Sequence, residues 1–296
     1  WFGRREGQVV AVIALGEEEA EIKPFSLVPD AQGEVVIEGR LKGEAQHFEA
    51  YINHGRAAVE ACHSDLSVAR PAFRFVCRPA ADDEAAWVQM LFAPPGRVLA
   101  TTFAQALVRR SPDMPPAYKA TRYADPAPVS KPEEFTRAAI QALNRARKEA
   151  GLRAVTLAAR ESATAAKLAP HYFDATLGRA TPQQADVIAL GLLAGWEVGG
   201  MIRGADLMSE LAPTLDAGRW LTSALEMPLG RHTLFARDIE QVAFGPYVWS
   251  DPGAIGAVVW YTAFRGEHEP EVKAPARDPL AGLTLTPSMR AVAKYL

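Results

Sequence analysis

Hydrophobic and polar residues alternate in short runs over roughly the first hundred positions. Residues 34–41 show the pattern clearly, because Val35, Ile37 and Leu41 fall on one face and charged residues fall mostly on the other. Turn residues such as glycine, proline, asparagine and aspartate separate such runs. Many short strands without a long helical period predict an Ig-like β-sandwich over residues 1–110. The other predicted strands are residues 9–15, 48–52, 72–77, 86–92 and 97–103.

Residues 111–132 have a different composition, with six prolines among mostly polar or small residues. Proline cannot continue a helix or take a central place in a sheet, because it lacks a backbone N–H group. This segment is therefore predicted to be an extended linker to a second domain.

From residue 133 the apolar positions recur at helical spacing. Helices are predicted at residues 133–150, 158–168, 182–193 and 212–223, followed by strands at 241–249 and 254–264. Pro170 is expected to end the second helix, and Pro228 and Gly230 mark a predicted loop before the strands. Helices followed by strands predict an α+β domain over residues 133–266, and residues 267–296 form a tail.

Composition narrows the classes of function. The 296 residues are 49% hydrophobic and 23% charged, and the formal net charge is −3. This balance argues against a nucleic acid or an anionic membrane surface as partner. The longest apolar runs fall short of the ~20 residues that span a bilayer, so no transmembrane segment is expected. Neither Ser162 nor Ser223 lies in a nucleophile-elbow sequence, which argues against a serine hydrolase.

The chain begins with Trp1 and has no initiating methionine, so we expect that a preceding piece, such as an export signal, has been removed. The two cysteines, Cys62 and Cys77, lie in strand-like segments and would form a disulfide in an exported protein. Two buried thiols in a cytosolic protein are the alternative. The histidines at positions 47, 54 and 63 lie in separate segments, so only the fold could gather them around a metal.

Several short motifs occur in a particular order after residue 133. The order is LNRARKEAGL at residues 143–152, an alanine-rich helix ending near His171, GWEV at 195–198, WLTS at 220–223, and PLGRH at 228–232. The closing strands carry VAFG at 242–245 and YTAF at 261–264. This order resembles the CAP superfamily, which includes cysteine-rich secretory, antigen-five and plant pathogenesis-related proteins.

The resemblance implies an α-β-α sandwich with a surface cleft. Family members line this cleft with two histidines and two acids that can hold a divalent metal such as zinc. His171 would be the first histidine, Glu197 the first acid and Glu226 the second. Aligning the family proline with Pro228 puts Gly230 at the second histidine position and Arg231 at the following arginine. His232 comes two residues after Gly230.

Three functions follow from this reading. The first is an exported cell-envelope or extracellular protein with a degenerate, non-catalytic cleft that holds a lipid, glycan or protein partner. The second is a metal-assisted hydrolase in which His171, Glu197 and His232 surround a metal-bound water. The third is a structural subunit that self-assembles through its proline-rich segments.

Overall fold

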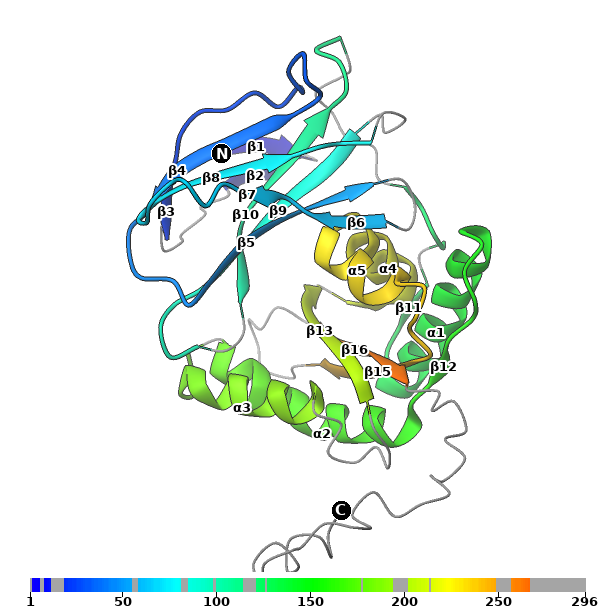
Figure 1. Ribbon diagram of the computed structural model, residues 1–296. Helices are drawn as coiled ribbons and strands as arrows, with labels where there is room; N and C mark the ends of the chain where they lie inside the picture. Colours follow the sequence, from blue (N-terminus) through cyan, green and yellow to red (C-terminus); the bar gives the residue numbers. More distant parts are fainter. Residues whose placement is uncertain are drawn as a thin grey trace, which may run out of the picture. The chain divides into compact units, whose positions relative to one another are not determined.

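A computed structural model shows the arrangement of the chain (Figure 1). Residues Trp1–Gly266 form one compact unit. The structure describes residues 2–5, 8–11, 19–54, 58–80, 85–97, 100–113, 121–125, 127–176, 178–193, 202–212, 214–248 and 257–266. The predicted tail at 267–296 therefore lies outside the described residues. Within the described ranges, no helix combines the length and apolar character needed to cross a bilayer.

Two four-stranded antiparallel sheets and a two-stranded one, β1–β2, make up the described N-terminal part (Figure 1). One four-stranded sheet has the order β10-β9-β5-β6 and the other β3-β4-β8-β7. Ile37 and Phe75 of one sheet share a core with Ile52 and Val88 of the other. The Ig-like class of this part stays a prediction. The strands are β1 (Phe2–Arg5), β2 (Gln8–Ala11), β3 (Ala20–Ile22), β4 (Val35–Leu41), β5 (His47–His54), β6 (Ala58–Ala61), β7 (His63–Ser64), β8 (Ala72–Cys77), β9 (Ala85–Ala93) and β10 (Thr101–Arg109).

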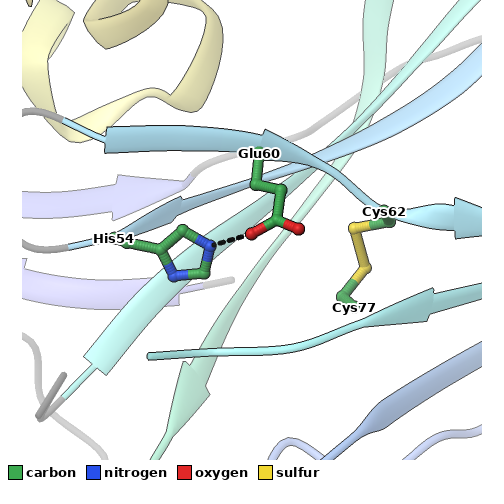
Figure 2. The surroundings of a disulfide bond; sticks show 4 residues. All are labelled: His54, Glu60, Cys62 and Cys77. Carbon is green, nitrogen blue, oxygen red and sulfur yellow. Dashed lines mark ion pairs between the residues drawn. A yellow bond between two sulfur atoms is a disulfide. The ribbon is translucent and has the colours of Figure 1, made fainter. Parts of the chain in front are cut away.

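Cys62 and Cys77 form a disulfide, as predicted (Figure 2). Cys62 lies where the chain passes from β6 of one sheet to β7 of the other, and Cys77 ends β8. The bond therefore ties this crossing to the end of β8, an inner strand of the second sheet. His54 and Glu60 pair nearby, with 3.3 Å between Nε2 and Oε2. The Nδ1 atom of His54 accepts a hydrogen bond of 3.1 Å from the backbone N–H of Ala80.

The C-terminal part has a sheet with helices on both faces. Its strand order is β12-β15-β16-β13, in which only the β12–β15 pairing is parallel. Alternating side chains of β15 face different helices: Phe244 packs against Trp220 of α4, and Gly245 lies against Ala165 of α2. Helices α2 and α3 therefore cover one face, and α1, α4 and α5 the other. The elements are β11 (Pro128–Val129), α1 (Pro132–Glu149), β12 (Thr156–Leu157), α2 (Ala159–Thr176), α3 (Pro182–Leu193), β13 (Ile202–Ala212), β14 (Leu215–Asp216), α4 (Ala217–Glu226), α5 (Pro228–Phe235), β15 (Gln241–Val248) and β16 (Ala257–Gly266).

This mixture of sheets and helices confirms the α+β class. The third predicted helix has its predicted bounds, and the two closing strands β15 and β16 lie where they were expected. The fourth predicted helix begins later, at Ala217, because the Asp216 side chain accepts a hydrogen bond from the Arg219 N–H and caps the helix.

The prediction that Pro170 ends the second helix is wrong, because α2 continues to Thr176 with Pro170 inside it. A proline in a helix removes one N–H donor and leaves the carbonyl four residues earlier without its partner. The next turn of α2 compensates by burying Tyr172 and Phe173, which pack with α3. Apolar burial on that turn outweighs the local cost of the proline.

The predicted loop around Pro228 and Gly230 is also wrong, because Pro228–Phe235 form helix α5. Pro228 stands at the first turn, where its missing N–H costs nothing. The N–H of Leu229, which has no acceptor within the first turn of the helix, donates to Oε1 of Gln89 at 2.9 Å. Gln89 belongs to β9. A residue 140 positions earlier in the chain thus caps the helix.

Part of the predicted linker packs against the C-terminal elements. β11 pairs with β14, and the Ala127 N–H donates to Oδ1 of Asp216 at 3.1 Å. Tyr123 is buried, and its ring meets that of Phe235 edge to face at 6.0 Å. Residues 121–125 and 127–129, here called the strap, therefore contribute to the core around α4 and α5.

Candidate functional site

The residues of the LNRARKEAGL motif hold two turns in place. The side chain of Asn144 makes two hydrogen bonds of 2.8 Å with the backbone of Val155: Nδ2 donates to its carbonyl, and Oδ1 accepts from its N–H. Gly151 adopts a φ of 72°, which only glycine takes without strain, and ends α1. This part of the motif therefore fixes the path of the chain from α1 into β12.

Arg147 of the same motif is fully buried. Its Nε donates to the carbonyl of Arg153 at 2.7 Å, and Nη1 donates to the carbonyls of Leu234 and Ala236 at 2.6 and 3.1 Å. Burial lowers the pKa of Arg147 to about 10, so the guanidinium remains charged at neutral pH. Arg147 thus joins the end of α1 to the end of α5 and is unavailable to a ligand.

Glu226 and Arg231 are brought together, but both are buried in structural contacts. The Glu226 carboxylate accepts hydrogen bonds from Nε1 of Trp87 at 3.3 Å and from the N–H of Thr121 at 3.2 Å. Arg231 donates through Nε to the carbonyl of Leu225 at 2.8 Å and through Nη2 to the hydroxyl of Tyr123 at 3.3 Å. These contacts connect α4 and α5 to β9 and to the strap.

Burial raises the pKa of Glu226, and its hydrogen bonds and the charge of Arg231 oppose that rise only in part. A carboxyl group held away from water in this way favours its protonated form.

The two candidate histidines lie on helices that cover opposite faces of the C-terminal sheet. His171 is exposed on α2, and its backbone carbonyl accepts a hydrogen bond of 3.3 Å from Nε2 of Gln184. His232 is half-buried on α5. Glu197 falls outside the described residues. In the described part of the chain, no group of three His, Cys, Asp or Glu side chains is placed to hold a metal ion. The structure therefore does not bring His171 and His232 together, and a zinc site that includes Glu197 stays a prediction.

A pocket of about 460 Å³ lies where α1, α2 and β15 meet. Its buried floor consists of Ser162, Phe244 and Pro246. Half-buried Ile140, Leu157 and Ala166 form its walls, and exposed Glu133, Arg137 and Ala163 mark its mouth. Its size is typical of a small-molecule site, and most of its surface is apolar.

The floor of this pocket is an edge of the sheet that offers few N–H donors. The carbonyls of Glu240 and Val242 accept hydrogen bonds from the N–H groups of Thr156 and Ala158. The backbone N–H and C=O groups of the even-numbered residues of β15 therefore point toward this edge. The Phe244 N–H already donates to Oγ of Ser162 at 3.2 Å. Pro246 has no N–H. A peptide strand added here would find no backbone donor at either position.

No family model matches the sequence, and no curated protein is significantly similar to it. Among solved structures, a cysteine-rich secretory protein from Staphylococcus aureus subsp. aureus Mu50 is similar, with 8% identity, a TM-score of 0.34, and coverage of 83% of this chain and 86% of that one. An extracellular protein containing an SCP domain from Bacillus anthracis str. Ames has 10% identity, a TM-score of 0.32, and coverage of 79% and 82%. Neither similarity is close enough to decide the family.

Proposed function

We propose that this protein is an exported, non-catalytic binding protein whose pocket between α1, α2 and β15 holds the apolar chain of a lipid. The observation that carries the proposal is the chemistry of the pocket. Its walls are the aliphatic side chains of Ile140, Leu157 and Ala166, and Phe244 lies at its floor. Burying a hydrocarbon chain against these groups is favourable by roughly 25 cal/mol for each Å² removed from water.

A lipid fits this pocket better than a glycan or a peptide. A glycan site needs several convergent polar groups for its hydroxyls, whereas the floor and walls offer two hydroxyls, those of Ser162 and Thr136, and Thr136 already donates to the Pro132 carbonyl at 3.2 Å. An added peptide strand needs backbone donors along the sheet edge, and Phe244 and Pro246 supply none. An alkyl chain requires neither.

The disulfide supports export. Disulfides persist in oxidising compartments and are rare in the cytosol, where thiols are kept reduced. The Cys62–Cys77 bond therefore favours an extracellular or cell-envelope location for the proposed binding protein.

The proposal is tested with a neutral, single-chain probe. Dodecanol, added below its solubility limit, is expected to bind the full chain with saturable one-to-one stoichiometry in a calorimetric titration. Ala163→Trp places a large ring at the mouth and should weaken binding at least about tenfold, or roughly 1.4 kcal/mol. Lys167→Trp is the matched control, because Lys167 is exposed on the same helix and does not line the pocket. Absence of saturable binding, or equal binding by both variants, would refute the proposal.

A further inference from the structure

The mouth of the pocket carries one negative and one positive charge. Glu133 and Arg137 are exposed and line the pocket, one helical turn apart on α1. Neither belongs to an ion pair in the described part of the chain; the nearest pair in sequence joins Lys131 to Glu134 at 3.9 Å. Side chains four residues apart on a helix have their Cβ atoms about 5–6 Å from each other. The mouth therefore presents two opposite charges side by side.

These two charges select for the charge of a ligand's head group. A purely anionic head would meet Arg137 favourably but would be repelled by Glu133, and a purely cationic head would face the reverse. A zwitterionic head can place its anionic group on the Arg137 guanidinium and its cationic group on the Glu133 carboxylate. Arginine suits a phosphate in particular, because its planar fork of donors matches the phosphate oxygens.

Ser162 adds a hydrogen-bond donor below the mouth. This residue is 8% exposed, and its Oγ accepts the Phe244 N–H. A hydroxyl can donate as well as accept, and no described residue accepts the Ser162 hydroxyl proton. That proton is available to an uncharged oxygen of a ligand whose alkyl chain lies in the pocket.

We infer that the pocket is specific for a single-chain zwitterionic amphiphile of the lysophospholipid type. Its phosphate binds Arg137, its ammonium group binds Glu133, its acyl ester oxygen accepts from Ser162, and its chain fills the space between α1, α2 and β15. This inference rests on the proposed lipid-binding function and names the class of lipid.

The test compares three probes with the same alkyl chain, each below its micelle concentration: dodecylphosphocholine, dodecyl phosphate and dodecyltrimethylammonium. Calorimetric titration of the full chain should show that dodecylphosphocholine binds about fivefold more tightly than either singly charged probe, because each exposed charge contributes up to about 1 kcal/mol. High salt should reduce this preference.

Single substitutions test which head-group charge each of the two side chains recognises. Arg137→Gln should abolish the preference for dodecylphosphocholine over the cationic probe, and Glu133→Gln should abolish its preference over the anionic probe. Arg145→Gln is the matched control, since Arg145 is exposed on α1 but does not line the pocket. Ser162→Ala should weaken the binding of lysophosphatidylcholine, which has an acyl ester, more than that of dodecylphosphocholine, which has none. Equal losses of affinity for the two lipids would overturn the ester contact.

The outcomes separate the two proposals. Binding of all three probes and of dodecanol with equal affinity would overturn the inference and leave the lipid-binding function standing. No binding of any of the four would refute the lipid-binding function itself.

Discussion

Arg97 and Asp186 form a two-pronged ion pair between the turn after β9 and helix α3. Nε of Arg97 lies 2.7 Å from Oδ2 of Asp186, and Nη2 lies 2.9 Å from Oδ1. Asp186 is 4% exposed. The hydrogen bond to Asp186 raises the pKa of Arg97, and burial raises the pKa of the neighbouring Tyr172. This charged contact joins the N-terminal sheets to the helices that cover the C-terminal sheet.

Arg97→Met should destabilise the protein strongly, because it removes the cation that makes two hydrogen bonds to the buried Asp186 carboxylate. We expect a loss of about 3 kcal/mol in the free energy of unfolding by urea. Adding Asp186→Asn should recover part of the loss, since the buried group is then neutral. Lys23→Met, which breaks an exposed pair with Glu38, should cost less than about 1 kcal/mol. A similar loss from Arg97→Met and Lys23→Met would contradict the expectation.

Arg147→Ala should be among the most damaging single substitutions in α1. It removes the partner of three backbone carbonyls and leaves a cavity in the core, for an expected cost of about 3–5 kcal/mol. Arg145→Ala tests the same change of residue type at an exposed position of α1 and should shift stability by less than about 0.5 kcal/mol. Thermal or urea unfolding of the two variants provides the comparison.

Glu226 should make stability fall as pH rises. Its folded-state pKa is raised, so the folded protein binds more protons than the unfolded chain between the ordinary and the raised value. The free energy of unfolding therefore decreases with increasing pH across that window, and the loss is complete above the raised pKa. Glu226→Gln keeps an oxygen acceptor but cannot ionise, so its unfolding free energy should lack this component. If urea titrations at several pH values gave parallel curves for both proteins, the assigned cause would be wrong.

The disulfide should stabilise the N-terminal sheets. Its cysteines are 15 residues apart, and closing a loop of that length contributes about 3 kcal/mol by restricting the unfolded chain. Reductant should lower the unfolding midpoint of the wild-type protein accordingly. The double variant Cys62→Ala with Cys77→Ala should show the lower midpoint already and should not respond to reductant.

Zinc should not bind tightly through the two candidate histidines. His171 and His232 lie on helices that cover opposite faces of the C-terminal sheet, so one ion cannot bridge them. Calorimetric titration of the wild type and of His171→Ala with zinc should give the same weak binding. Tight stoichiometric binding that disappears in His171→Ala would instead support metal-assisted hydrolysis.

The sequence predicted elements best where one local pattern decides them. β4 alternates clearly between a buried and an outward face, and α3 begins at a proline and keeps its predicted bounds. The strand β13 was not predicted, because its sequence IRGADLMSELA has no clean alternation and its pairing partner β16 comes more than forty residues later. The start of α5 depends on Gln89 of a distant strand, which no local pattern reveals.

The candidate site was harder to predict. The motif residues pointed to a cleft, but Asn144 and Arg147 hold turns, and Glu226 and Arg231 are buried in contacts with β9 and the strap. The pocket draws on α1, α2 and β15, so no contiguous motif marks it. Ile140, which lines the pocket, continues the buried stripe of α1 through Leu143 and Arg147, so it gave no separate signal.

The strap affects where an independently folding fragment could begin. Tyr123 lies in the same core as Phe235, and its hydroxyl accepts a hydrogen bond from Arg231. A fragment starting at residue 133 would lack this ring and would expose the apolar surface beneath it to water. Recombinant dissection of the C-terminal half should therefore cut before Thr121, so that the strap is expressed with α4 and α5.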